Sequence, residues 1–193
     1  MIDSKKRAHG PMEPSPWVTR FAPLISTDGE VLDLACGSGR HTRYILDRNH
    51  KVTALDKDIS KASDLASNPN VYLVQADLEI AAPWPFPDKK FSGIIVTNYL
   101  YRPLFPILLA ALAEGGILIY ETFAIGNEQY GHPRNPAFLL KKGELLEYAK
   151  GHLNIVAFEQ GVVEGVDHPK VIQRICARKD KSFKLAELPT NPR

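Results

Sequence analysis

The fold of this chain follows from one stretch, residues 31–42, which reads VLDLACGSGRHT. Its mostly apolar first part predicts a buried strand over Val31–Ala35. The small residues of Cys36–Gly39 cannot fill a core, but they allow the backbone to come close to a ligand. A helix pattern follows over residues 39–49. A strand, a glycine turn and a helix in this order are typical of the opening of a nucleotide-type site.

The composition argues against several classes of protein. The chain has 193 residues, 44% hydrophobic and 24% charged, which predicts one globular domain in the cytoplasm. The net charge of +2 gives no strong nucleic-acid signal. The first ten residues lack the apolar segment of a signal peptide, and the apolar stretch 104–113 is too short to cross a membrane. Cys36 and Cys176 fall on separate predicted strands, which favours a reducing compartment over a disulfide.

Strand and helix patterns alternate along the rest of the chain. Strands are predicted over residues 31–35, 51–56, 71–77, 91–98, 117–123, 153–163 and 170–179. Helices are predicted over residues 17–25, 39–49, 57–67, 102–116 and 140–151, and loops over 78–90 and 124–138. This alternation predicts an α/β fold with a doubly wound, mostly parallel, seven-stranded Rossmann-like sheet. Helices should cover both faces, and an antiparallel strand pair should close one edge.

The residues at the strand ends distinguish between two kinds of nucleotide ligand. A dinucleotide favours a third glycine in the turn, and Thr42 stands at that position. S-adenosylmethionine has no phosphate and needs carboxylates for its ribose and adenine. Asp56 ends the second strand, where it can accept both ribose hydroxyls, and Asp77 ends the third, where it can accept from the adenine amino group. The pattern therefore favours S-adenosylmethionine.

These segments together resemble a known family over most of the chain, from about Pro14 to Lys179. The class I S-adenosylmethionine-dependent methyltransferases are similar in the segments VLDLACGSGRHT, VTALDKD, VQADLE, FSGIIVTNYL and GGILIYETF. Ala35 is a departure, because the family most often has glycine there. The segments FLLKKGELLEYAKG and ICARK further resemble the small tellurite-resistance and thiopurine-type methyltransferases. The resemblance implies one methyltransferase domain over residues 1–180, with flexible ends at 1–13 and 181–193.

The same motifs imply a cofactor site. The residues assigned to it are Asp33, Ala35, Gly37, Gly39, Arg40, Asp56, Lys57, Asp77, Leu78 and Asn98. Three alternatives stay open: Asp33 holds the turn by local hydrogen bonds, Asp77 forms an Asx turn, and Asp56 is a solvated strand end. His41 either packs against the fold, contacts an anion at the helix start or acts as a general base. No metal site is predicted.

The substrate side is less defined by the sequence. In the family the segment after the fourth strand faces the methyl group, which points to Tyr99 and Tyr101. The polar loop after the fifth strand offers Tyr130, His132 and Arg134.

No catalytic residue is assigned. Because a soft or already ionised nucleophile needs no base, we expect in-line methyl transfer to a small anionic or soft-nucleophile substrate. Arg40, Arg102 and Arg134 are candidates to pair with an anion. Two alternatives remain: a methyltransferase acting on RNA or protein, and a nucleotide-binding Rossmann protein that transfers no methyl group. The oligomeric state is left open.

Overall fold

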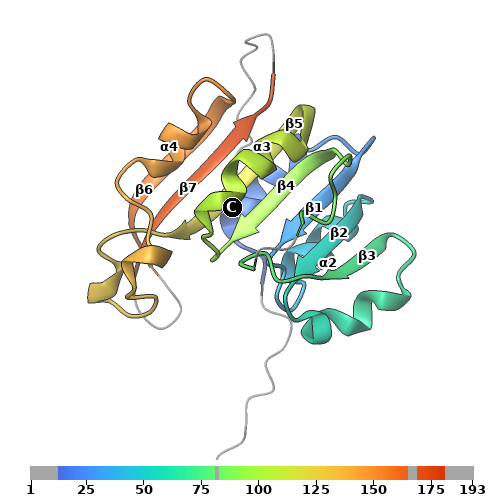
Figure 1. Cartoon of the computed structure of the whole chain (residues 1–193), viewed down its shortest axis with the longest axis horizontal. Helices are drawn as coiled ribbons and strands as arrows, with labels where there is room; N and C mark the ends of the chain where they lie inside the picture. The colour runs from blue at the N-terminus through green and yellow to red at the C-terminus, as the bar shows by residue number, and fades with distance from the viewer. Residues whose placement is uncertain (1–12, 81–82, 165–168, 181–193) are drawn as a thin grey trace, which may run out of the picture.

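The structure is a computed structural model that describes residues 13–80, 83–164 and 169–180. Within these residues the chain forms one sheet with the strand order β3-β2-β1-β4-β5-β7-β6 (Figure 1). The strands are β1 (Glu30–Leu34), β2 (Lys51–Asp56), β3 (Val71–Gln75), β4 (Phe91–Thr97), β5 (Leu112–Phe123), β6 (Asn154–Val163) and β7 (Lys170–Arg178). The ends expected to be flexible lie largely outside the described residues, since 1–12 and 181–193 are not among them.

The pairing of the strands confirms the predicted fold class. β1 lies inside the sheet and pairs in parallel with β2 on one side and β4 on the other. β3 and β5 extend the parallel part, and β7 runs antiparallel between β5 and β6. The strand order therefore reverses between β1 and β4. In open α/β sheets, ligands bind beyond the carboxyl ends of the strands at this switch point.

Helices cover both faces of the sheet, as predicted. The α-helices are α1 (Pro16–Phe21), α2 (Arg40–Leu46), α3 (Phe105–Ala111) and α4 (Glu144–Ala149). The 3₁₀ segments are η1 (Ala22–Leu24), η2 (Ile59–Ser67), η3 (Arg102–Leu104), η4 (Asn127–Gln129) and η5 (Pro136–Phe138). α3 and α4 pack into one core with alternate residues of the strands, and α1 and α2 pack into a second core on the other face. Figure 1 shows α3 crossing in front of the sheet.

The helix predicted over residues 102–116 was wrong at its end. α3 stops at Ala111 and β5 begins at Leu112. Leu112 pairs with Phe91, and the register then shifts so that Gly93 pairs with Ile117. Gly115 has a φ of +75°, and a Cβ at Gly116 would stand 2.8 Å from a backbone carbonyl oxygen. The glycine pair therefore forms an irregular strand entry instead of a helix end.

The segment predicted as a helix over residues 57–67 is helical, but as a 3₁₀ helix over Ile59–Ser67. Its inward side chains are Ile59, Ala62 and Leu65. They are three residues apart, which is one turn of a 3₁₀ helix. The Asp58 carboxylate caps its first turn by accepting from the Ser60 N–H group. No helix among the described residues has the length and apolar character needed to cross a membrane.

Arg102 connects α4 to the loop that precedes it in the chain. Its Nε and Nη2 atoms donate to the two carboxylate oxygens of Glu144 at 2.6 and 2.9 Å. Nη1 and Nη2 also donate to the carbonyl oxygens of Ala137 and Leu139. Its guanidinium is therefore committed to α4 and the loop before it. This arrangement does not support the expectation that Arg102 pairs with an anionic substrate.

We expect Arg102→Met to lower the free energy of unfolding by about 2–3 kcal/mol, because it leaves the mostly buried Glu144 carboxylate without its partner. Urea unfolding followed by circular dichroism measures the change. Glu147→Gln is the matched control: it removes an exposed ion pair with Lys150 and should leave the stability nearly unchanged. Equal, small effects of both changes would show that the Arg102 contacts contribute little.

Candidate functional site

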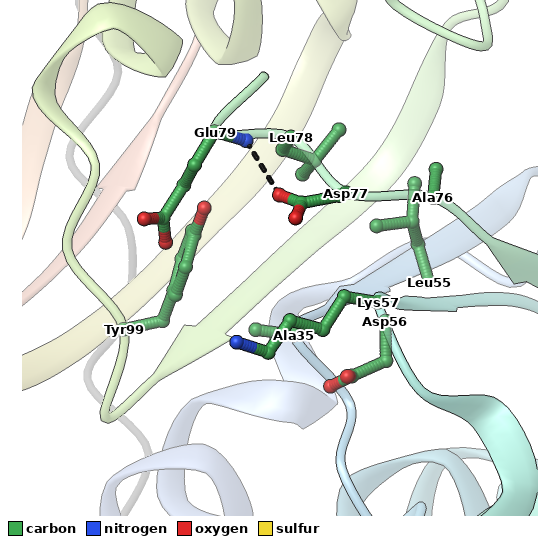
Figure 2. Close-up of a pocket in the computed structure, with 9 residues that line it drawn as sticks. All are labelled: Ala35, Leu55, Asp56, Lys57, Ala76, Asp77, Leu78, Glu79 and Tyr99. Atoms are coloured by element: carbon green, nitrogen blue, oxygen red, sulfur yellow. Dashed lines mark hydrogen bonds between the residues drawn. The ribbon is translucent and has the colours of Figure 1, made fainter.

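A cavity of about 160 Å³ opens at the carboxyl ends of β1 to β4. Its volume is below the ~300–1,000 Å³ typical of small-molecule sites, so it suits one part of a larger ligand. Figure 2 shows the residues around it, which come from the ends of four strands. They are Ala35, Leu55, Asp56, Lys57, Ala76, Asp77, Leu78, Glu79 and Tyr99. The structure thus brings together six residues that the sequence assigned to the cofactor or the substrate: Ala35, Asp56, Lys57, Asp77, Leu78 and Tyr99.

The two glycines of the turn after β1 serve different purposes. Gly37 has a φ of +55°, and no described atom lies within 4 Å of the place where its Cβ would stand. Gly39 has a φ of +74°, but its Cβ would lie 2.9 Å from the Leu65 side chain. Gly37 therefore leaves open space for a ligand. Gly39 allows the start of α2 to pack closely against η2.

Backbone strain gathers at the ends of β1 and β4. Ala35 has a φ of +55°, a left-handed conformation that costs a residue with a Cβ roughly 1–2 kcal/mol. Asn98 has a φ of +53° and is exposed just past β4. Such conformations persist where the surrounding structure imposes them, and they gather at ligand sites. The Ala35 methyl group therefore projects from a strained position in the cavity wall.

Asp56 is fixed by the backbone on both sides of its carboxylate. Oδ2 accepts the N–H of Gly37 at 2.8 Å, and Oδ1 accepts the N–H of Asp58 at 3.0 Å. Each oxygen keeps a further lone pair that can accept a hydrogen bond. This leaves a bidentate acceptor at the cavity wall, which is the arrangement that two neighbouring ribose hydroxyls require.

Asp77 forms the Asx turn that the sequence left open as its alternative role. Its Oδ1 atom accepts the N–H of Glu79 at 2.9 Å (Figure 2). The carboxylate is exposed at the cavity, so the turn orients it without burying it. Leu78, between these two residues, is half-buried and adds apolar surface to the same wall. Lys57 supplies the ammonium group that lies at the cavity.

Asp33 lies beneath the turn and is absent from the cavity lining. Its Oδ2 atom accepts from the Thr42 hydroxyl at 2.6 Å, so it ties β1 to α2. Burial raises the pKa of Asp33 to about 6, although the bonds from Thr42 and the nearby Arg40 oppose this shift. These contacts match the alternative in which Asp33 holds the turn by local hydrogen bonds.

His41 and Arg40 connect α2 to the segment before α1. The Nε2 atom of buried His41 accepts the Ser15 N–H at 3.1 Å, and Nδ1 lies 3.4 Å from the Thr97 hydroxyl. Burial lowers the pKa of His41 to about 3, so the ring is neutral and fully used by the fold. Arg40 is half-buried and donates to the Glu13 carbonyl oxygen. The contacts of His41 support the packing role over that of a general base.

The predicted substrate residues separate into two groups. Tyr99 is half-buried in the cavity wall and faces Glu79 (Figure 2). Burial and the Glu79 carboxylate raise the pKa of Tyr99 above its ordinary value, so the phenol stays protonated. Tyr101 is also half-buried, but it does not line the cavity. Tyr99 and Tyr101 do not lie on one face of a strand, because β4 ends at Thr97, before both residues.

Tyr130, His132 and Arg134 are exposed on the loop after β5, outside the cavity lining. Figure 1 places this loop at the end of β5, near β6 and β7 and away from β3. Asn127 holds the loop: its Nδ2 donates to the Pro133 carbonyl oxygen, and its Oδ1 accepts the Val171 N–H. The structure therefore does not bring these three side chains to the cavity.

Sequence reasoning missed Glu79, Leu55 and Ala76 as lining residues. Each lies within two residues of an assigned one, so their places at strand ends were the signal that was available. Among the residues that the structure describes, no cluster of His, Cys, Asp or Glu is suited to hold a metal ion.

Comparisons with known proteins show which proteins this chain is similar to. Residues 31–116 match the family described as "Methyltransferase domain". Over 92 residues the chain is 33% identical to trans-aconitate 2-methyltransferase of Acidovorax sp. (strain JS42). That match covers 46% of this chain and only 36% of the relative, so the chain corresponds to about a third of its length.

Two solved structures show the same fold at low sequence identity. TehB from Haemophilus influenzae has a TM-score of 0.69 and 21% identity, over 84% of this chain and 61% of that chain. The 1,6-didemethyltoxoflavin-N1-methyltransferase of Burkholderia thailandensis has a TM-score of 0.62 and 22% identity, over 86% and 77%. That second structure holds 1,6-didemethyltoxoflavin and S-adenosylhomocysteine.

Over residues 31–116 the chain therefore resembles a methyltransferase domain, and it has the fold of the class I S-adenosylmethionine-dependent methyltransferases. Within this class its fold resembles that of TehB, which agrees with the resemblance seen in the sequence. The comparisons support S-adenosylmethionine as the cofactor. The cavity and the turn beside it fit this cofactor, since the cavity offers carboxylate acceptors at Asp56 and Asp77 and the turn offers open backbone at Gly37.

The buried Asp33 carboxyl should make stability depend on pH. Burial raises the pKa of Asp33 in the folded protein from the ordinary value of 3.8 to about 6. The carboxyl therefore contributes fully to the free energy of unfolding below about pH 4, and this contribution is lost as the pH rises through about 6. Asn mimics the protonated carboxyl. We expect Asp33→Asn to gain up to ~3 kcal/mol over the wild type between pH 4 and pH 7.5, measured by urea unfolding. Asp47→Asn, at the exposed end of α2, should track the wild type. If the difference in the free energy of unfolding between Asp33→Asn and the wild type does not change with pH, the prediction is wrong.

Proposed function

We propose that this protein is an S-adenosylmethionine-dependent methyltransferase that acts on a small, anionic or soft-nucleophile substrate. One observation carries the proposal: the Asp56 carboxylate is held by backbone N–H groups beside the open turn at Gly37. The proposal treats residues 1–180 as one domain. It places the protein in the cytoplasm, where the two buried cysteines, Cys36 and Cys176, stay reduced.

The residues of the site would bind and orient the reactants. The cofactor supplies a methyl group already activated for in-line displacement, so the protein need not create an electrophile. Asp56 would hold the ribose hydroxyls, and Asp77 and Leu78 would hold the adenine. Tyr99 and the Ala35 methyl group would limit the space at the cavity wall and exclude water. Alignment of two bound reactants corresponds to effective molarities of ~10⁵ M or more, enough to account for much of the rate.

Two groups near the site, His41 and Tyr99, are not available to accept a proton, and this supports a substrate whose nucleophile is already ionised. His41 is neutral and hydrogen-bonded within the fold, and Tyr99 stays protonated. A nucleophile that arrives ionised, such as a carboxylate or thiolate, needs no proton acceptor. The name of the Acidovorax relative specifies trans-aconitate, which is a carboxylate anion, and this supports the anionic class. The small net charge of +2 favours a small molecule over RNA.

The cofactor part of the proposal is tested by binding to the purified protein and to Asp56→Ala. We expect calorimetry to show binding of S-adenosylmethionine and its demethylated product. Asp56→Ala should weaken both by about 1.5–3 kcal/mol, because a charge-assisted hydrogen bond pair is lost. Circular dichroism should show an unchanged fold. Binding of NAD without S-adenosylmethionine would overturn the proposal, and normal binding by the variant would remove Asp56 from the site.

A transfer assay with labelled cofactor over small carboxylates, thiols, tRNA and peptides then separates substrate classes.

Of the three arginines predicted to pair with an anion, we propose Arg134 for the substrate, because it is exposed, whereas Arg102 is committed to Glu144 and Arg40 donates to Glu13. Its fork can bind a carboxylate with two hydrogen bonds, which a lysine cannot reproduce. With a carboxylate substrate from the assay, Arg134→Lys should lower kcat/KM roughly tenfold, or about 1.4 kcal/mol, and leave cofactor affinity unchanged. Arg48→Lys, at the exposed end of α2, is the control. Wild-type kinetics in Arg134→Lys would exclude this role.

A further inference from the structure

We propose that Glu79 makes the cavity prefer the positively charged methyl donor over its neutral, demethylated product. This inference rests on the proposed function and adds a residue that controls product release from the same site. Glu79 follows β3 by a few residues, and its side chain forms part of the cavity wall (Figure 2). No motif of the sequence assigned it a role.

Glu79 and Tyr99 face one another from two different segments. Glu79 comes from the chain after β3, and Tyr99 comes from the chain after β4 (Figure 2). Burial, and after it the Glu79 carboxylate, raise the pKa of the Tyr99 phenol above its ordinary value. Tyr99 therefore remains a neutral hydrogen-bond donor that can orient the carboxylate it faces.

The charges around the cavity do not balance. Asp56, Asp77 and Glu79 bring three carboxylates to the lining, and Lys57 brings one ammonium group. Backbone N–H groups fix the carboxylates of Asp56 and Asp77 as acceptors. All three carboxylates attract a positive charge, but Asp56 and Asp77 are also assigned to the ribose and adenine, which donor and product share. Glu79 faces a phenol and has no such assignment, so its charge can be removed without loss of a contact that both ligands make.

Methyl transfer changes the charge of the cofactor by one unit. The bond between the methyl carbon and sulfur breaks, its electron pair stays on sulfur, and the carbon forms a new bond to the substrate. The sulfonium thus becomes a neutral thioether. At an effective dielectric constant of ~20–40, a carboxylate within about 10 Å of a positive charge favours the charged form roughly three- to tenfold after screening. Glu79 would therefore retain the donor and promote release of the product.

Calorimetry with S-adenosylmethionine and with S-adenosylhomocysteine tests this inference on the full chain at low salt. We expect Glu79→Gln to weaken binding of S-adenosylmethionine roughly three- to tenfold and to change binding of S-adenosylhomocysteine less than about twofold. Glu79→Asp keeps the charge and should restore most of the preference. Glu147→Gln removes an exposed carboxylate on α4 and should leave both affinities at the wild-type values.

The outcomes separate this inference from the proposed function. If the wild type binds neither ligand, the proposed function fails. If both ligands bind and Glu79→Gln weakens them equally, Glu79 is a common contact and the charge preference is overturned. An unchanged ratio of the two affinities in Glu79→Gln also overturns it. If Glu79→Asp behaves like Glu79→Gln, a carboxylate at this position does not restore the preference, and the inference that the charge of Glu79 sets it is overturned.

Discussion

The site depends on one hydrogen bond, from the Gly37 N–H group to the Asp56 carboxylate at 2.8 Å. It joins the turn after β1 to the end of β2. The bond is possible because the two strands are parallel neighbours, with Leu34 opposite Leu55, so that both chains leave the sheet at the same level. The turn then presents the Gly37 N–H group to the carboxylate at the end of the neighbouring strand. The open turn and the carboxylate acceptor therefore hold each other in place.

Many polar groups near this bond serve the fold. Asp33 accepts from Thr42, His41 joins Ser15 to Thr97, and both are buried. A buried polar group without a partner would cost about 1–3 kcal/mol, so these pairs keep the turn and α2 in one arrangement. The groups left at the cavity are mostly carboxylates. Their negative charge suits a ligand that carries a sulfonium and an ammonium, and it disfavours a pyrophosphate.

The chain between β3 and β4 gives the cavity its second wall. Residues 76–79 leave the edge strand β3, and Tyr99 follows β4, on the far side of β1 and β2 in the strand order. The strained backbone at Ala35 and Asn98 marks the ends of β1 and β4 between these walls. Because the cavity is built from strand ends, its shape follows from the sheet and from few side chains. The loop that carries Arg134 is held separately by Asn127.

Local sequence patterns are enough to predict the class of fold and the candidate acceptors at the strand ends. Apolar runs that end in Asp56 and Asp77, and a glycine turn after β1, are local patterns, and parallel strands bring their ends to one edge. Only the tertiary structure decided which polar residues remain available. Asp33, His41 and Arg102 look functional in the sequence, but partners distant in the chain occupy them. The same holds for Glu79: its position facing Tyr99 depends on packing between two segments that no local pattern relates.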